Sequence, residues 1–178
     1  MSEIILRPMV LDDLQRFNNI NLDYWTEMYT TSFYTTYLIK DPDLCLVAEG
    51  PTGSLAGYLL AKVEGKGQEW HSHISAVSVS PEFRRAGVGK LLIDHFEQVS
   101  EDVHECYFAD LYVRVTNSIA IEMYKLRGYL IYRTVRGYYS GTEDAYDMRK
   151  PLKRDVRLNS LTGAGKTVDP EDLPEYLD

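Results

Sequence analysis

The chain has 178 residues, of which 44% are hydrophobic and 26% are charged. This composition is typical of one compact domain with a buried core, and it excludes a disordered or fibrous chain. The formal charge of −8 at pH 7 speaks against a general binder of nucleic acid or of anionic membranes.

The two cysteines and the N-terminus indicate a reducing, cytoplasmic setting. Cys45 and Cys106 stand alone in apolar runs without CxxC spacing, so we expect buried free thiols rather than a disulfide framework or a zinc site. The chain begins without a basic segment followed by a long apolar run, and no stretch approaches the ~20 apolar residues of a membrane helix.

The first half of the chain predicts two short helices and three strands. Residues 4–6 read as a strand, Asp12 and Asp13 open a helix, and residues 32–39 form a second helix. Residues 21–31 have no clean period, and we interpret them as an ordered loop that carries a function. A hairpin follows, with strands at residues 44–49 and 55–63 on either side of the turn Pro51–Ser54.

The next strand, residues 70–79, changes phase along its length. Apolar residues occupy even positions up to Ile74 and Ala76 and odd positions at Val77 and Val79. Such a slip predicts a β-bulge near Ala76 and Val77.

The second half alternates helices with strands. The segments are a helix at residues 87–99 with its apolar stripe at Val88, Leu91, Leu92, Phe96 and Val99, a strand at 107–115, a helix from Asn117 that Gly128 stops, and strands at 129–140 and 145–152 around the turn Gly141–Asp144. We therefore predict an α/β (α+β) fold. Its centre is a mixed, mostly antiparallel sheet of about seven strands with helices on both faces.

The composition changes after residue 152. Residues 159–166 are small and polar, and the last ten residues carry five acids and no base. We expect one domain over residues 1–152 and a tail over residues 153–178, either mobile or docked on a partner.

Residues 84–90 concentrate glycine and positive charge between a strand and a helix. The sequence Arg84-Arg85-Ala86-Gly87-Val88-Gly89-Lys90 combines close backbone approach with the free N–H groups of a helix N-terminus, and both suit a pyrophosphate. A surface turn with a basic cluster is the alternative. Nucleotide motifs do not fit, because no Gly-Lys-Ser/Thr ends the loop and no third glycine completes a dinucleotide fingerprint.

The pattern Arg-Arg-x-Gly-x-Gly resembles the coenzyme A loop of the GNAT acetyltransferase family. Residues 111–129, with Asn117, Tyr124 and Gly128, resemble the family's second conserved block. Within the family, the segments 16–23, 69–73, 81–85, 132–135 and 144–150 resemble N-terminal acetyltransferases of the NatB type, and the resemblance covers residues 4 to 155.

The resemblance implies direct transfer of acetyl from acetyl-CoA to an amine, with neither a metal nor an acyl-enzyme. It assigns coenzyme A to the loop Arg84, Arg85, Ala86, Gly87, Val88, Gly89 and Lys90, and the pantetheine and the thioester to backbone N–H groups of Val77 and Val79. The expected bulge gives an independent reason for unpaired N–H groups there.

Asn117 and Tyr124 are seven residues apart, nearly two helical turns, so they face one side of a helix. The resemblance implies that Tyr124 donates a proton to the departing thiolate while Asn117 orients the cofactor or a water. Taken alone, Tyr124 also fits a core aromatic between helix and sheet.

The NatB type implies a peptide beginning with Met followed by Asp, Glu, Asn or Gln. His73 and Ser75 share one face of a strand and can donate to the second side chain. Members of the NatB type commonly have Thr at the position of Ser75. The alternative for a histidine on a strand is a structural role, and we assign that role to His71.

Four further residues are expected to form the mouth around Met and its amine: Glu27, Tyr29, Tyr138 and Tyr139. A solvated loop glutamate is the alternative for Glu27. Tyrosine is in excess in this chain, 14 against five Phe, and the pair at 138–139 gives part of that excess a function.

The NatB type also implies a large auxiliary subunit of TPR-like helices, which forms a heterodimer and brings the enzyme to ribosomes and nascent N-termini. The aromatic residues along 32–39 support such a surface only weakly, since they also fit a core. Two other functions stay open: a lysine or polyamine acetyltransferase, and a non-catalytic module with a GNAT-like fold.

Overall fold

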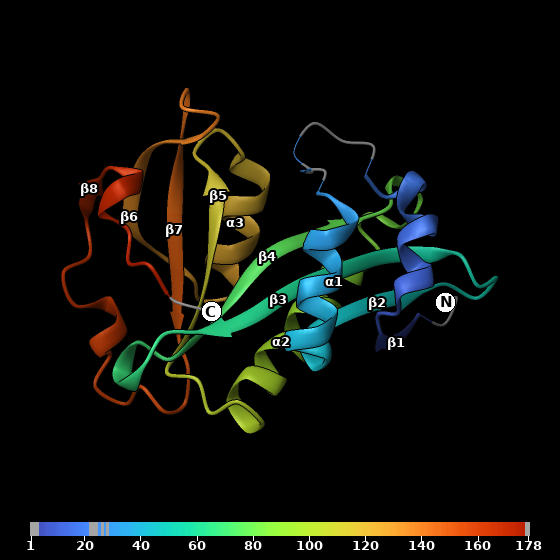
Figure 1. Ribbon diagram of the computed structural model, residues 1–178, viewed down its shortest axis with the longest axis horizontal. Coiled ribbons are helices and arrows are strands. Elements are labelled where there is room, and N and C mark those ends of the chain that lie inside the picture. Colours follow the sequence, from blue (N-terminus) through green and yellow to red (C-terminus); the bar gives the residue numbers. More distant parts are fainter. Residues whose placement is uncertain (1–3, 22–24, 26, 28, 177–178) are drawn as a thin grey trace. The chain divides into compact units, whose positions relative to one another are not determined.

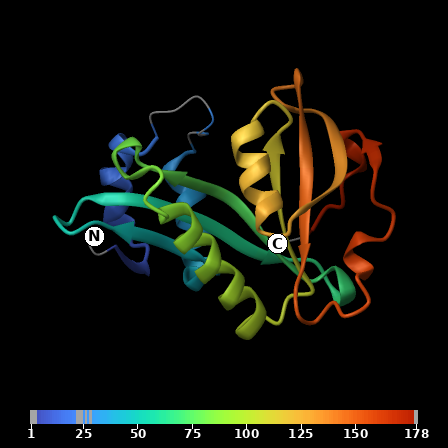
Figure 2. The ribbon, with the colours of Figure 1, turned by 180° about the vertical axis from the view of Figure 1, so that it is seen from behind.

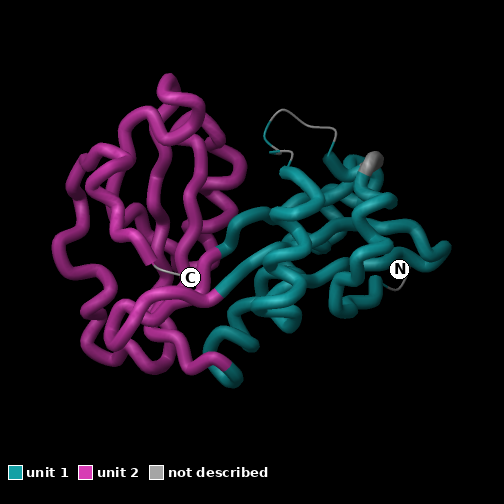
Figure 3. The backbone as a smooth tube through the Cα atoms, viewed as in Figure 1, with its two compact units in different colours: residues 1–62, 74–103 teal, residues 63–73, 104–178 magenta. Residues whose placement is uncertain are grey.

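The computed structural model describes residues 4–21, 25, 27 and 29–176, which form eight strands and three α-helices (Figure 1). The chain is divided into two compact units. Unit 1 comprises residues 1–62 and 74–103, and unit 2 comprises residues 63–73 and 104–178 (Figure 3). Within the described residues, no helix has both the length and the apolar character needed to cross a bilayer.

The strands follow the order β1-β2-β3-β4-β5-β7-β6-β8 in one sheet. Their bounds are Ile5–Pro8 for β1, Cys45–Glu49 for β2, Leu55–Glu64 for β3, His71–Val79 for β4, Phe108–Arg114 for β5, Leu130–Tyr139 for β6, Glu143–Pro151 for β7 and Lys166–Val168 for β8. The pairs β1–β2, β2–β3, β5–β7 and β6–β7 are antiparallel, and β6–β8 is parallel. The predicted mixed, mostly antiparallel sheet is confirmed, with eight strands instead of about seven.

The helices lie close to their predicted positions. They are α1 at Thr31–Lys40, α2 at Val88–Asp102 and α3 at Ser118–Leu126, with short 3-10 helices η1 at Leu11–Asn19, η2 at Pro42–Leu44, η3 at Gly67–Glu69, η4 at Pro81–Phe83, η5 at Asn159–Leu161 and η6 at Pro170–Asp172. The helix expected after Asp12 is thus a 3-10 helix. The buried carboxylate of Asp13 ties its first turn to β1, because Arg7 donates to both carboxylate oxygens at 2.8 Å.

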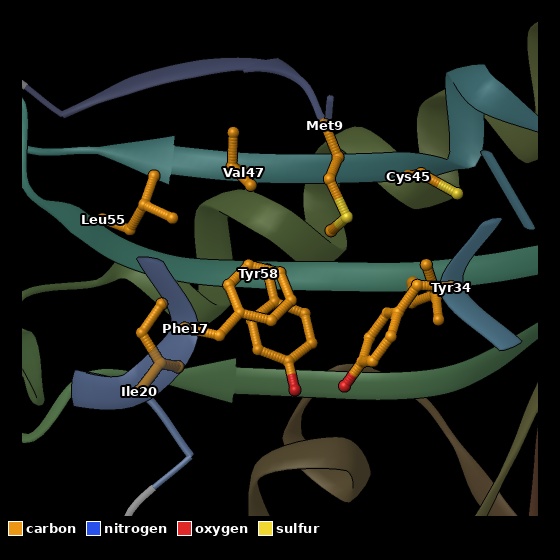
Figure 4. Packing of buried hydrophobic residues seen from close by; sticks show 9 residues of the cluster. Met9, Phe17, Ile20, Tyr34, Cys45, Val47, Leu55 and Tyr58 are labelled. Carbon is orange, nitrogen blue, oxygen red and sulfur yellow. The ribbon is translucent and has the colours of Figure 1, made fainter. Parts of the chain in front are cut away.

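In unit 1, helices cover both faces of the sheet. On one face Phe17 of η1 stacks on Tyr58 of β3, with ring centroids 4.2 Å apart, and Tyr34 of α1 packs edge-on against Phe17 (Figure 4). On the other face α2 approaches so closely that a Cβ on Gly57 would lie 3.2 Å from a methyl of Val88. Figures 1 and 2 show α1 and α2 in front of these strands in opposite views.

The buried stripe of α2 differs from the predicted one. The buried residues are Val88, Leu92, Ile93, Phe96 and Ser100, while Leu91 is exposed. Ser100 can be buried because its hydroxyl donates to the carbonyl of Phe96 at 2.7 Å. The apolar pattern therefore misplaced the centre of the buried face by about one residue.

Two consecutive residues of β4 contact the side of the sheet that carries α1. The Ser75 hydroxyl lies 2.6 Å from that of Tyr37, and Ala76 packs against the Phe17–Tyr58 cluster. Neighbouring side chains on one face are the mark of a phase slip, so these contacts support the expected bulge, one residue earlier than predicted.

Unit 2 is built on β5, β7 and β6. The register places Asp110 opposite Arg149 and Leu111 opposite Met148. Asn117 caps α3, since its side-chain oxygen accepts from Ala120 N at 3.2 Å, and Gly128 beyond its end has φ +89°. The predicted start and stop of this helix are both confirmed.

The segment after residue 152 is ordered against unit 2 as far as residue 176. It supplies β8, which pairs with β6 through Thr134↔Thr167, and the buried Asp155 accepts N–H groups of Asn159 and Ser160 at 2.8 and 3.0 Å. This segment accounts for the eighth strand. Its polar composition does not indicate a strand, and the carboxylate of its buried Asp155 is satisfied by backbone N–H groups. Cys45 and Cys106 are buried free thiols, as expected.

Candidate active site

In unit 1, the loop between η4 and α2 presents an uncapped helix N-terminus. Gly87 has φ +84° and is the N-cap residue of α2, so it has no side chain to accept a hydrogen bond from the N–H groups of the first turn. The first N–H groups of a helix lack partners within the helix and carry partial positive charge, so they attract anions. Arg84 and Arg85 are exposed beside them, while Lys90 pairs with Asp94 at 2.6 Å.

Two side chains hold this N-terminus against the sheet of unit 1. Val88 is buried against Gly57, and a Cβ on Gly89 would lie 3.7 Å from a methyl of Val79. Val77 and Val79 are half-buried on β4. Every residue of the predicted coenzyme A site in unit 1 therefore lies on β4, on the loop or in the first turn of α2.

Of the residues in unit 1 that were predicted to bind the peptide, Tyr29 contacts Ser75. Tyr29 donates to the carbonyl of Ser75 at 3.4 Å, and Tyr37, which the sequence did not single out, bonds to its hydroxyl. Glu27 is exposed. The rest of the expected functional loop, residues 22–24, 26 and 28, lies outside the described residues.

In unit 2, His73 is fixed by a buried carboxylate. Its Nδ1 lies 2.7 Å from Oδ1 of Asp110, which is 4% exposed, and its ring lies over Tyr112 with centroids 5.4 Å apart. Sequence reasoning missed both partners. The signal was an aspartate within the apolar strand Phe108–Val113, where a charge must have a partner.

The predicted pair Tyr138 and Tyr139 extends this arrangement into a row of rings. Tyr112 stacks on Tyr138 at 4.7 Å, Tyr138 meets Tyr139 edge-on at 5.1 Å, and the Arg114 guanidinium lies 4.1 Å from the Tyr139 ring centre. We call Tyr112, Tyr138 and Tyr139 the tyrosine row. The structure thus brings His73 and both predicted tyrosines together on unit 2.

Gly137 sets the position of the tyrosine row. It has φ +55°, it sits where the β6–β7 register shifts between Val135 and Tyr139, and its N–H donates to Asp144 at 2.8 Å. A Cβ there would lie 3.0 Å from the carbonyl oxygen of Gly141.

We expect Gly137→Ala to displace Tyr138 and to raise the KM for the peptide expected from the sequence by up to about tenfold, which corresponds to ~1.4 kcal/mol, with the KM for the expected coenzyme unchanged. Gly141→Ala is the matched control, since Gly141 also has positive φ, +72°, but a Cβ added there would meet nothing within 4 Å. Initial rates for both variants test this. An equal response of the two KM values to Gly137→Ala would contradict it.

Tyr124 lies on α3 in unit 2, and Asn117 is the residue that caps the start of this helix. Tyr124 is buried with its ring edge-on to Tyr129, centroids 5.5 Å apart, and burial raises the pKa of its hydroxyl well above the ordinary value. No described residue forms a hydrogen bond with that hydroxyl. Asn117 uses its carbonyl oxygen to cap α3, which leaves its amide N–H groups for a ligand.

A cluster of buried charges underlies the site in unit 2. Burial and the neighbouring Asp110 raise the pKa of Asp147 to about 6, while Arg133 donates to it at 2.8 Å. Arg149 lies 3.6 Å from Asp147 and packs over the ring of Tyr132 at 3.7 Å. Only Asp147 and Arg149 share a strand, β7, so no local pattern indicates that they meet Asp110 of β5 and Arg133 of β6.

This combination of strand, glycine loop and uncapped helix is the hallmark of a family. The chain belongs to the acetyltransferase (GNAT) family, whose model matches residues 14–129.

Similarity to individual proteins is closer still. The chain is 52% identical to N-alpha-acetyltransferase 20 of Dictyostelium discoideum, over 94% of this chain and 96% of that one. It is 47% identical to the N-terminal acetyltransferase B complex catalytic subunit NAA20 of Arabidopsis thaliana, over 96% and 98%. The crystal structure of Chaetomium thermophilum Naa20 with a bisubstrate analogue superposes with a TM-score of 0.88 at 40% identity, over 94% of this chain and 97% of that one. The chain is thus similar over nearly its whole length to NatB catalytic subunits.

Proposed function

We propose that this chain is the catalytic subunit of an N-terminal acetyltransferase of the NatB type. It transfers acetyl from acetyl-CoA to the α-amino group of an initiator Met that is followed by Asp, Glu, Asn or Gln. The observation that carries the proposal is the 52% identity to a curated N-alpha-acetyltransferase over 94% of the chain.

Acetyl-CoA is the co-substrate in this proposal. Related structures were solved with a bisubstrate analogue or with CoA. The uncapped N-terminus of α2 suits a pyrophosphate, and Arg84 and Arg85 add charge to the loop. Residues Arg84 to Lys90 bind the coenzyme, and backbone N–H groups of Val77 and Val79 receive the pantetheine and polarise the thioester carbonyl.

The acetyl group passes directly to the amine. Neither cysteine suits an acyl-enzyme, since both are buried and burial raises the pKa of Cys45 to about 12. A free α-amino group titrates near pH 8, so roughly a tenth of the peptide is already the neutral nucleophile at pH 7 and the rest must lose a proton. Tyr124 keeps its proton at working pH and gives it to the departing thiolate, and Asn117 orients the cofactor or a water.

The peptide is recognised through its first two residues. Glu27, Tyr29, Tyr138 and Tyr139 surround Met and its amine, and His73 and Ser75 meet the second side chain. In support, Tyr29 contacts Ser75 and the tyrosine row continues from His73.

A partner chain completes the enzyme. Related structures are described as NatB complexes, and we propose a heterodimer with a large TPR-like subunit that places the enzyme at cytoplasmic ribosomes. Of the aromatic residues of α1, Tyr34 is buried in the core cluster of unit 1, and Phe33 and Tyr37 are partly buried against it. Ile39, at 78% exposed, is the apolar side chain that α1 leaves open.

A peptide panel tests this function. The chain, alone and with a NatB auxiliary subunit, is incubated with acetyl-CoA and peptides varied at residues one and two, and products are identified by mass spectrometry. Acetylation of the Met α-amine in the Met-Asp, Met-Glu, Met-Asn and Met-Gln peptides is expected. Preference for a lysine side chain or for spermidine would replace the proposal, and absence of acetyl-CoA binding by calorimetry would favour a non-catalytic module.

His73→Ala separates the second-residue role from a structural one. We expect kcat/KM for Met-Asp to fall by about 10- to 10²-fold, the range for a hydrogen bond to a charged group. A Met-Leu peptide, whose second side chain accepts no hydrogen bond, should keep its lower rate. Equal losses on both peptides would argue against the role.

A further inference from the structure

Asp110 is a carboxylate held in the interior of unit 2 and directed at one nitrogen of His73. It comes from β5, opposite Arg149 on β7, and its Oδ1 lies 2.7 Å from His73 Nδ1. Burial alone would raise its pKa, but the charges of His71, His73 and Arg149 and the hydrogen bond from His73 lower it to about 2. Asp110 is therefore ionised at working pH and can only accept hydrogen bonds.

An obligatory acceptor at Nδ1 fixes where the proton of His73 resides. Nδ1 must carry a hydrogen in both the neutral and the charged ring, so only Nε2 gains or loses one. No described residue bonds to Nε2 of His73, and the side chain remains 12% exposed.

His71, two residues earlier, shows what a structural histidine looks like on the same strand. Its side chain is 1% exposed, its Nδ1 lies 2.6 Å from the carbonyl of Glu69, and its ring stacks on Phe108 at 4.6 Å. Its Nε2 faces Glu64 at 3.5 Å and Asp110 at 3.7 Å. Both nitrogens of His71 thus face protein atoms, whereas His73 bonds through Nδ1 alone as far as the described residues are concerned.

We propose that Asp110 is the positioning residue that lets one site accept both acidic and amide second residues. With Nδ1–H held by Asp110, the neutral His73 ring offers Nε2 as an acceptor to the side-chain amide of Asn or Gln. The protonated ring, balanced by the Asp110 charge, offers Nε2–H to the carboxylate of Asp or Glu. The inference rests on the proposed function, in which His73 meets the second residue.

Both acidic and basic groups surround His73 in unit 2. The titratable and charged groups nearest to it include His71 on β4, Asp110 and Tyr112 on β5, Arg133 and Tyr138 on β6, and Asp147 and Arg149 on β7. Asp110 is the one of these in direct contact with the imidazole, 2.7 Å from Nδ1, so its negative charge is the nearest to the ring.

Asp110→Asn tests the proposal, because an amide oxygen can still accept Nδ1–H while the charge that balances the imidazolium is lost. We expect kcat/KM for Met-Asp and Met-Glu to fall about tenfold, with Met-Asn and Met-Gln within about twofold. Glu64→Gln is the matched control, since it removes a nearby carboxylate that pairs with His71 instead of His73. It should leave kcat/KM for all four peptides unchanged. Equal losses on all four peptides for a folded Asp110→Asn protein would overturn the proposal.

Two measurements on the unmodified protein keep the test decisive if the variant does not fold. The ratio of kcat/KM for Met-Asp to that for Met-Asn should decrease as pH rises and the ring loses its second proton. Titration of the α-amine cancels in this ratio because both peptides carry it. A ratio independent of pH between 5.5 and 8.5, chosen as about one unit below to two above the usual histidine pKa, would overturn the proposal.

The second measurement does not depend on enzymatic activity. Nitrogen-15 NMR of labelled histidine should show the neutral His73 ring protonated at Nδ1, and a proton at Nε2 would overturn the proposal. If no Met peptide is acetylated at all, the proposed function fails, while the NMR result still decides whether Asp110 sets the tautomer.

Discussion

Tyr124→Phe is expected to lower kcat about 10²-fold, within the range for loss of a proton donor in the transition state. The ring is buried on α3 and its hydroxyl bonds to no described residue, so removing the oxygen leaves the packing intact. The KM for peptide should change little, because the proton is needed only when the thiolate leaves. Steady-state rates and the near-UV circular dichroism of the variant check both statements.

Tyr129→Phe provides the control for this variant. Tyr129 is fully buried, and its ring meets that of Tyr124 edge-on at 5.5 Å, so the substitution removes a hydroxyl from the same aromatic pair. Its kcat should remain near that of the unmodified protein. A kcat for Tyr124→Phe that also stays near the unmodified value would remove Tyr124 from the mechanism.

Local features were predictable because their signals are local. The turn at 51–54, the cap at Asn117 and the stop at Gly128 depend on residues within one turn of each other, and all three appear where expected. The loop at Arg84–Lys90 belongs with them, since a helix N-terminus after a strand is defined by neighbouring residues.

Contacts between distant strands could not be read in the same way. His73 was a candidate from its strand alone, but its partner Asp110 is 37 residues away and depends on how β4 and β5 are aligned. The eighth strand was missed for a related reason, since residues 166–168 pair with β6 through backbone groups and have no apolar alternation. Burial of Asp155 and Ser160 likewise requires donors and carbonyls that pattern analysis does not locate.

The many tyrosines of this chain show the same difference between local signals and contacts across strands. Tyr34 and Tyr58 lie in the core of unit 1, and the apolar spacing of their helix and strand is a local signal of that burial. The tyrosine row is a cross-strand arrangement, in which Tyr112 of β5 joins the predicted pair on β6. Composition pointed to an aromatic surface near residue 138, but only the strand register identified its third member.

Arg149→Met is expected to be the most destabilising of these substitutions, with a loss of about 3 kcal/mol in the free energy of unfolding. Arg149 is 3% exposed, and its guanidinium lies over the rings of Tyr132 and Phe108 and donates to the carbonyl of Ser160 at 3.1 Å. Methionine keeps most of the side-chain volume, so the loss reports the missing charge beside Asp147. Urea unfolding measures it, and protease cleavage after residue 152 should accelerate because the Ser160 contact is lost.

The pH dependence of this loss separates charge from packing. The folded-state pKa of Asp147 is raised from 3.8 to about 6, so its ionisation costs stability as pH rises through that range, and Arg149 offsets part of the cost. The loss caused by Arg149→Met should therefore be larger at pH 8 than at pH 5. Arg136→Met, which breaks an exposed ion pair with Asp169, is the control and should leave unfolding unchanged at either pH. An Arg149→Met loss that is the same at both pH values would attribute the effect to packing between the two rings instead of to the buried charge.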